Sequence, residues 1–151
     1  MKFVKATLKD IEFMQKLVFP EVEQGIILER SDDEIAQNIR SYILAKEGEK
    51  LVGFGALHFH TPFLGEIRSL VVSNDFRGKG IGKKIVLNLL QEGRDYLAKE
   101  IFTLTYQKAF FESMGFNEIS KDKLPAHKIW ADCIKCKHFP VCDEIALIQT
   151  I

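Results

Sequence analysis

Residues 76–82 read FRGKGIG and place three glycines and two cations after the apolar run at 70–72. Glycine has no Cβ, so a backbone rich in it can turn tightly and approach a ligand closely. A strand is predicted to end and a helix to begin here, and the first amides of a helix can bind a phosphate. We therefore interpret the stretch as an anion site, with charge added by Arg77, Lys79, Lys83 and Lys84. An ordinary glycine turn with a solvated basic face is the alternative.

Spacing distinguishes this stretch from two common nucleotide-binding loops. The GxxxxGK[ST] loop is excluded because Lys84 stands where that motif needs Ser or Thr. The dinucleotide fingerprint GxGxxG is excluded because no pair of these glycines is followed by a third at the required distance. The pattern that does fit is Arg77-x-x-Gly80-x-Gly82.

The overall composition is that of an ordinary globular protein. Its 151 residues are 46% hydrophobic and 28% charged, and 21 basic residues balance 21 acidic ones. Because the net charge is zero, a nucleic acid is not an expected partner. No apolar run approaches the roughly 20 residues of a membrane helix, and the amino terminus lacks the apolar core of a signal peptide. We expect a single domain over residues 1–151, in the cytoplasm and without a membrane partner; the oligomeric state is undecided, and a homodimer stays open.

Apolar periodicity predicts alternating helices and strands. Helices are predicted near 8–19, where TLKD resembles a capping box, and from Ser31, where SDDE is a stronger one. Residues 42–45 and 51–59 flank the polar turn KEGEK and are typical of a hairpin. The elements predicted after it are a strand at 66–72, an amphipathic helix at 81–98, a strand at 101–105, a small helix at 107–114 stopped by Gly115, and a last strand at 144–151.

Residues 120–143 form the one long stretch without periodicity, which is typical of a functional segment or a special constraint. It contains Cys133-x-x-Cys136, with His138 and Cys142 downstream. A tetrahedral zinc site built from these four side chains is one interpretation. Reduced cysteines that pack a loop near the substrate, or a redox-sensitive pair, are the others. A single CxxC knuckle does not decide between them, so no metal is assigned.

Two motifs in this order resemble those of the GNAT N-acetyltransferases. The loop Arg77-x-x-Gly80-x-Gly82 is similar to the pyrophosphate loop with which that family holds acetyl-CoA. AFFESMGF at 109–116 is similar to the family's next helix, which ends in a Gly-Phe step. The resemblance implies an α+β fold with a mixed, mostly antiparallel central sheet flanked by helices. It also implies that acetyl-CoA is the cosubstrate.

Further segments resemble one subfamily, the amino-acid N-acetyltransferases, and in particular short stand-alone proteins similar to the catalytic domain of N-acetylglutamate synthase. This resemblance covers residues 26–148. It is less specific for the substrate than for the cofactor, because pockets vary on a shared fold. The segments that carry it are ERS at 29–31, GALH at 55–58, GEIRSLVV at 65–72, LTYQKAFFESMGF at 104–116, KLP at 123–125 and WADCIKCKHFPVCDEIAL at 130–147.

The resemblance assigns the acetyl-CoA site to the end of the 66–72 strand and to the loop that follows. The backbone amide of Val71 or Val72 would donate to the thioester oxygen, where negative charge develops. The side chains of both valines are expected in the core. The complete set of expected CoA-binding residues is Leu70, Val71, Val72, Arg77, Gly78, Lys79, Gly80, Ile81, Gly82, Lys83 and Phe111.

Acetyl transfer to an amine requires a base, because the ammonium must lose a proton, directly or through water, before it can attack. The family often places this base at the start of the strand that leads into the CoA loop, which is Glu66 here. An exposed carboxylate at a strand end is the alternative. His58 is the second candidate because histidine ordinarily titrates near neutrality, although a lone histidine on a strand is more often structural.

A general acid is harder to assign. In this family a tyrosine four residues before the Gly-Phe step often protonates the leaving thiolate of CoA, but Phe111 occupies that position and cannot donate. Either no specific acid is used, or Tyr106 at the end of the preceding strand serves, or the thiolate leaves unprotonated into solvent. Tyr106 can equally be a packed aromatic residue.

Two arginines are candidates for substrate binding, because the two carboxylates of glutamate call for bidentate cations. Arg30 lies at the position that looks like the ligand of the α-carboxylate in the synthase. Arg68 shares a strand face with Glu66, because residues two apart on a strand point the same way. For each arginine, a plain surface position is the alternative.

We therefore expect an acetyl-CoA-dependent enzyme that acetylates the α-amine of an amino acid, a small-molecule substrate, with L-glutamate favoured and arginine biosynthesis as the implied pathway. The same chemistry on another amine, or on a protein amino terminus, is the alternative among enzymes. A CoA-binding sensor that lost turnover is the alternative from another class, and Phe111 is its one hint.

Overall fold

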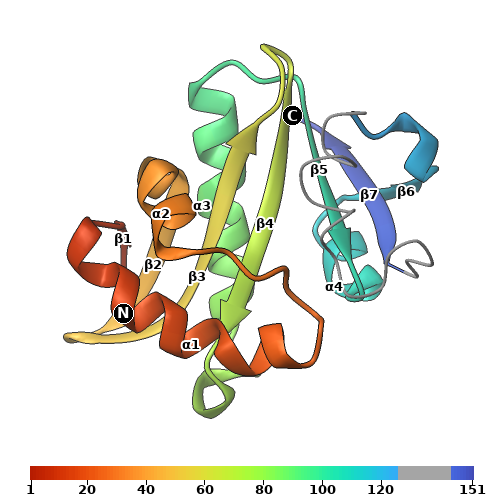
Figure 1. The fold of residues 1–151 in the computed structure, drawn as a ribbon. Helices are drawn as coiled ribbons and strands as arrows, with labels where there is room; N and C mark the ends of the chain where they lie inside the picture. Colours follow the sequence, from red (N-terminus) through yellow and green to blue (C-terminus); the bar gives the residue numbers. More distant parts are fainter. Residues whose placement is uncertain (126–143) are drawn as a thin grey trace.

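The computed structural model describes residues 1–125 and 144–151. A seven-stranded sheet has the order β1-β2-β3-β4-β5-β7-β6, and its neighbouring strands are antiparallel except for the pair β4 and β5 (Figure 1). The strands are β1 (Lys2–Lys5), β2 (Tyr42–Glu47), β3 (Lys50–Phe59), β4 (Leu64–Val72), β5 (Glu100–Thr105), β6 (Asn117–Ile119) and β7 (Ile145–Thr150). The helices are α1 (Ile11–Glu23), α2 (Asp32–Gln37), α3 (Ile81–Asp95) and α4 (Lys108–Glu112), joined by short 3₁₀ turns.

Helices cover both faces of the sheet. Successive residues of β2 point to opposite faces, so Ile43 packs in the cluster under α3, whereas Leu44 packs in the cluster under α1 and α2. Ile85 and Leu89 are the fully buried centre of the α3 side, and Met14 of α1 is fully buried on the other. These layers confirm the expected α+β fold with a mostly antiparallel sheet flanked by helices.

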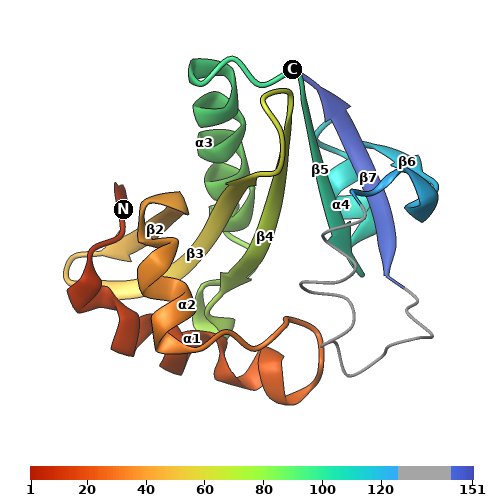
Figure 2. The ribbon, with the colours of Figure 1, turned by 45° about the horizontal axis from the view of Figure 1, so that its top comes forward.

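The sheet opens between its two parallel strands. β4 and β5 are paired only where Leu64–Glu66 lies beside Glu100–Phe102, and no further register pair joins them within the described residues. Toward their carboxyl ends the strands diverge, as Figure 2 shows. Thr103 on β5 donates a hydrogen bond to the carbonyl oxygen of Ile67, 2.9 Å away, so its hydroxyl satisfies a backbone acceptor at the start of the opening.

A bulge in β4 lies beside this opening. The register between β3 and β4 shifts between Phe54 and Ala56, and Ser69 has a positive φ of 59°. A bulge leaves an extra residue out of the ladder and bends its strand, and a non-glycine residue at positive φ is uncommon. The strained backbone therefore lies in the carboxyl-terminal half of β4, beyond the residues that pair with β5.

Helix α1 is longer than the sequence predicts. It runs to Glu23, beyond the expected end near residue 19, although Pro20 lies inside it. Proline removes one helical hydrogen bond and crowds the preceding turn, so it usually ends a helix. Here Val18 is buried and Val22 packs against the same cluster. Burial of the apolar face outweighs the local proline signal.

Two smaller differences also depend on tertiary contacts. α3 ends at Asp95 instead of near Ala98, and Leu97 then adopts a left-handed φ of 65°. The three-residue strand β6 carries no apolar alternation, and the sequence does not predict it; it forms by pairing with the edge of β7. Gly115 does end the short helix α4 as predicted, with a φ of 97°.

Candidate active site

A cavity of about 520 Å³ occupies the opening between β4 and β5. Most of its wall comes from the loop at residues 25–31 after α1, residues 66–70 of β4, residues 103–107 at the end of β5, and the aromatic pair Phe110 and Phe111 of α4. Val22, Glu34 and Glu144 complete the lining. The loop after α1 crosses near the open end of the two strands, as Figure 1 shows. A cavity of this size, bounded by apolar and charged side chains, is typical of a small-molecule site.

Glu66 lies in the wall of this cavity, and its residue is only 1% exposed. Its Oε1 is 2.9 Å from Nε2 of His60, and each of the two side chains is 2% exposed. A buried carboxylate requires a hydrogen-bonding or charged partner, because burying an isolated charge is very costly. The alternative of an exposed strand-end carboxylate is therefore wrong for Glu66.

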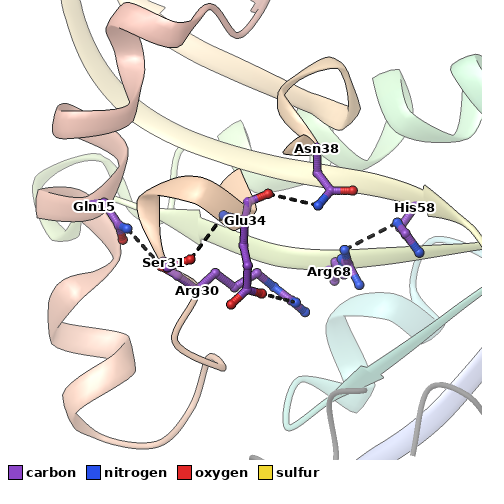
Figure 3. Close-up of polar contacts among 7 residues, drawn as sticks. All are labelled: Gln15, Arg30, Ser31, Glu34, Asn38, His58 and Arg68. Atoms are coloured by element: carbon purple, nitrogen blue, oxygen red, sulfur yellow. Dashed lines mark hydrogen bonds and ion pairs between the residues drawn. The ribbon is translucent and has the colours of Figure 1, made fainter. Parts of the chain in front are cut away.

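His58 lies directly across from Glu66 in the β3–β4 register, but it does not line the cavity. Its Nδ1 is 3.3 Å from Nη2 of Arg68, and its ring meets the ring of His60 edge to face at 4.8 Å. Figure 3 shows the contact between His58 and Arg68. The structure thus places His58 behind the wall that Glu66 forms, which leaves it the weaker of the two candidate bases.

Arg30 and Arg68 both line the cavity, as the interpretation of a substrate site requires. The side chain of Arg30 is 10% exposed, and its Nη1 is 3.6 Å from Oε2 of Glu34. Gln15 on α1 donates from Nε2 to the carbonyl oxygen of Arg30 at 2.8 Å, which ties the loop to the helix (Figure 3). The alternative of plain surface arginines is wrong for Arg30, because most of its side chain is buried.

The loop that carries Arg30 is held by the start of α2. Ser31 is the N-cap, and its Oγ accepts a hydrogen bond from the backbone N–H of Glu34 at 3.1 Å. This contact confirms Ser31 as the N-cap, which is one half of the capping box predicted from the sequence. Asn38 donates from Nδ2 to the carbonyl oxygen of Glu34 at 2.9 Å at the other end of the helix (Figure 3). Arg30 therefore projects from a backbone that both neighbouring helices fix.

Tyr42 is a residue of this site that the sequence did not single out. It is 2% exposed and lies with Arg30 and Ser69 around a small second cavity, which shares these last two residues with the first. Burial raises the pKa of the Tyr42 phenol, and the charges of Arg30 and Arg68 lower it only in part. A hydrogen bond joins the phenol to Ser69 at the bulge. The available signal was one hydroxyl in the otherwise apolar stretch YILA.

The glycine loop lies at the carboxyl end of β4. Gly78 and Gly80 both have a φ of 78°, and a Cβ at either position would meet no other atom within 4 Å. These glycines are therefore needed for backbone conformation and not for space. Gly80 is the N-cap of α3, whose first residues are Ile81, Gly82 and Lys83. Their amides begin the helix at the exposed loop, which is the geometry that binds an anion.

The side chains around this loop are not all directed at a ligand. Arg77 donates from Nη2 to Oε1 of Glu21 at 2.6 Å and from Nε to the carbonyl oxygen of Val72 at 3.1 Å. Lys79 lies 5.1 Å from the centre of the Phe76 ring. Arg77 thus connects the loop to α1, and its charge is shared with a carboxylate.

The remaining predicted residues divide between the cavity and the core. Leu70 and Tyr106 line the cavity, whereas Val71 is buried in the core cluster of α1 and α2. Phe111 lines the cavity but is 3% exposed and packs edge to face against Phe116, with ring centres 5.3 Å apart. The structure therefore places Tyr106 at the site, whereas Phe111 is a packed apolar residue of the cavity wall.

The candidate zinc ligands Cys133, Cys136, His138 and Cys142 lie outside the described residues. Within residues 1–125 and 144–151, no group of three or more His, Cys, Asp or Glu side chains could hold a metal ion. The described helices include none that is both long and apolar enough to cross a membrane.

Comparison with known proteins agrees with this geometry. The model of the acetyltransferase (GNAT) family matches residues 8–116. An uncharacterized N-acetyltransferase of Chlorobaculum tepidum is 38% identical over 150 residues, which are 97% of this chain and 94% of that protein. The chain belongs to the GNAT family of acetyltransferases. It is an acetyl-CoA-dependent N-acetyltransferase, and the expectation of an enzyme is confirmed.

Two further proteins indicate which members of the GNAT family the chain resembles. An amino-acid acetyltransferase of Mycobacterium tuberculosis is 35% identical over 118 residues, which are 76% of this chain and 67% of that protein. A Mycobacterium tuberculosis protein in complex with CoA has the same fold, with a TM-score of 0.86, 26% identity and coverage of 100% of this chain and 99% of that one. The resemblance to the amino-acid acetyltransferases within the GNAT family is thereby confirmed.

Proposed function

We propose that this N-acetyltransferase acetylates the α-amine of L-glutamate. The observation that carries the proposal is the placement of Arg30 and Arg68 in the wall of one cavity with the carboxylate of Glu66. Two guanidinium groups suit a substrate with two carboxylates, and a carboxylate beside them suits an amine that must lose a proton. The amino-acid acetyltransferase of Mycobacterium tuberculosis supports the same class of substrate.

In the proposed mechanism Arg30 holds the α-carboxylate of the acceptor. Its partner Glu34 lies 3.6 Å away with a half-exposed side chain, so the substrate carboxylate can join this pair or replace Glu34 in it. Arg68, on the β4 wall, would hold the side-chain carboxylate. Because both cations are fixed to rigid backbone, the amine is delivered in one orientation, which is how positioning lowers a barrier.

Glu66 then takes a proton from the ammonium. The free amine attacks the thioester carbon and forms the new C–N bond. As the C–S bond breaks, its electron pair leaves on the sulfur, and the nitrogen gives up its second proton to water, which leaves the neutral amide. Acetyl-CoA supplies the activated acetyl group and would lie with its pyrophosphate on the amides of residues 80–83. The amide of Val71 or Val72 would stabilise the developing oxyanion.

The thiolate of CoA is the leaving group, and two routes for it fit the site. Tyr106 lines the cavity at the end of β5 and could return a proton from its hydroxyl. Alternatively the thiolate leaves unprotonated into solvent. Cytoplasmic arginine biosynthesis is the setting that acetylation of glutamate implies.

A basic amine is a second candidate substrate. Glu29, Glu34 and Glu144 also line the cavity, so carboxylates there outnumber arginines. A substrate with a second cationic group would form ion pairs with these carboxylates. Glutamate instead requires that its two carboxylates pair with the arginines. The two candidates make opposite demands on the charge of the acceptor side chain.

The test is thiol release from acetyl-CoA by the purified protein, measured with a thiol reagent against glutamate, aspartate, glutamine, lysine and a peptide with a free amino terminus. Release confined to glutamate supports the proposal. Release with lysine or the peptide, and none with glutamate, overturns the substrate and leaves the acetyl transfer in place.

A further inference from the structure

His60 forms a short polar contact with the carboxylate in the cavity wall, and the mechanism above gives it no role. Its Nε2 lies 2.9 Å from Oε1 of Glu66. Glu66 lines the cavity but His60 does not, so the histidine contacts the carboxylate from behind. The contact joins the end of β3 to the start of β4, six residues apart across the hairpin.

The direction of this hydrogen bond follows from the chemistry of the two groups. An ionised carboxylate only accepts hydrogen bonds, so when Glu66 is ionised the Nε2 of His60 must carry the proton and donate it. That contact occupies one oxygen of the carboxylate. Because Glu66 lines the cavity, a carboxylate held by this contact faces the space where the amine must lose its proton.

The surroundings of His60 hold its ring in place. The ring lies 5.4 Å from that of Phe102 on β5 and meets His58 on β3 edge to face at 4.8 Å. Its backbone N–H donates to the carbonyl oxygen of Leu64 at 2.9 Å. Within residues 1–125 and 144–151, the titratable groups near it include Glu66 and His58, with Arg68 beyond His58. A ring packed on both sides can orient a carboxylate better than a mobile side chain can.

We propose that His60 is a positioning residue that holds the carboxylate of Glu66 in the orientation required for a general base. The inference rests on the proposed role of Glu66 in acetyl transfer but not on the identity of the acceptor amine. His60 touches neither substrate, and it acts only through Glu66. Loss of its donor weakens the hold on the buried carboxylate and favours its protonated form, and both changes impair the base.

The experiment compares His60→Gln with His60→Leu in steady-state assays of the full chain, with whichever amine of the panel the wild type acetylates. Leucine removes the donor, and kcat is expected to fall 10- to 100-fold while KM for acetyl-CoA and for the amine changes less than about threefold. Glutamine places an N–H near the position of Nε2, and kcat is expected to return to within about fivefold of wild type. Phe59→Leu, at the neighbouring exposed position where β3 ends, is the matched control.

A double substitution provides the second readout. If His60 acts only through Glu66, adding His60→Leu to Glu66→Gln causes no further loss of kcat, because coupled residues are not additive. Equal kcat in His60→Leu and wild type overturns the proposal. So does a double variant whose loss is the product of the two single losses.

A spectroscopic measurement separates this proposal from the proposed function and from a failure of His60→Leu to fold. In the ¹⁵N NMR spectrum of the wild-type protein labelled at histidine, His60 is expected to carry a proton on Nε2 near neutral pH. A neutral His60 with its proton on Nδ1 alone overturns the inference, whether or not any amine of the panel is acetylated.

Discussion

The glycine loop and the acceptor cavity recognise their ligands in different ways. The loop is one run of residues, 76–83, and it offers mainly backbone: two glycines at positive φ and the first amides of α3. The cavity gathers side chains from distant parts of the chain, with Arg30 before α2, Glu66 on β4 and Tyr106 after β5. Backbone recognition requires particular residue types at fixed spacing, whereas side-chain recognition requires only that the fold bring the groups together.

A side chain of the loop also links the two regions. Arg77 of the loop donates to Glu21 on α1, and the last turns of that helix lead into the loop that carries Arg30. We therefore predict that substitutions in the glycine loop change the kinetics of acetyl-CoA more than those of the acceptor amine. Substitutions in the cavity are expected to spare acetyl-CoA binding.

The largest effect is expected from Glu66→Gln, which breaks the chemistry of the cavity and spares the loop. Removing a general base ordinarily costs about 10²–10⁴-fold in rate, so kcat is expected to fall by that amount. Affinity for CoA, measured by calorimetry, is expected to stay within about twofold of wild type. Retention of full kcat by Glu66→Gln would remove it from the mechanism.

A smaller effect, confined to the acceptor, is expected from Arg30→Gln. Hydrogen bonds to charged groups contribute about 1.5–3 kcal/mol, which corresponds to a 10- to 100-fold rise in KM for an acidic acceptor. KM for acetyl-CoA is expected to change little, and Arg30→Lys is expected to lie between the two, because it keeps the charge and loses the fork. An unchanged KM for the acceptor contradicts the role given to Arg30.

Gly80→Ala tests the loop in the same way. A left-handed conformation costs a residue with a Cβ about 1–2 kcal/mol, so the loop is expected to relax and KM for acetyl-CoA to rise several-fold. Gly48→Ala is the matched control, because Gly48 also has a positive φ, of 61°, and open space around its Cβ, but lies in the β2–β3 turn. Both variants lose stability to chemical denaturation, and a rise in KM with Gly48→Ala as well contradicts a specific role for the loop.

The smallest effect is expected from Asp10→Asn, which lies outside both regions. Burial raises the pKa of Asp10, but hydrogen bonds from Thr7 and Lys46 outweigh burial and lower the pKa below its usual 3.8. A lowered pKa contributes stability above the unfolded value, and this is lost as the pH falls through the folded value. We expect Asp10→Asn to reduce the free energy of unfolding by about 0.5–1 kcal/mol at pH 7. This difference should shrink below pH 3.8, with kcat and KM unchanged at pH 7.

The fold was largely predictable because, in each strand and helix next to the site, apolar residues recur at the spacing typical of that element. Where prediction failed, contacts from elsewhere decided the outcome. Pro20 continues inside α1 because Val18 and Val22 are packed against the sheet, and β6 exists only because β7 offers it an edge. A window of local sequence contains neither contact.

The glycine loop could be recognised in the sequence because a positive φ and an exposed helix start restrict which residue types can occupy those positions. These restricted positions are neighbours along the chain, so they form a motif. The carboxylate and the arginines were visible only as candidates, since residue type does not reveal burial. The tertiary structure buried Glu66 against His60 within one hairpin, placed Arg30 and Tyr42 around one small cavity, and opened the parallel strands β4 and β5. Arg30, Tyr42 and the two strands come from separate parts of the chain, and only packing of the whole sheet brings them together.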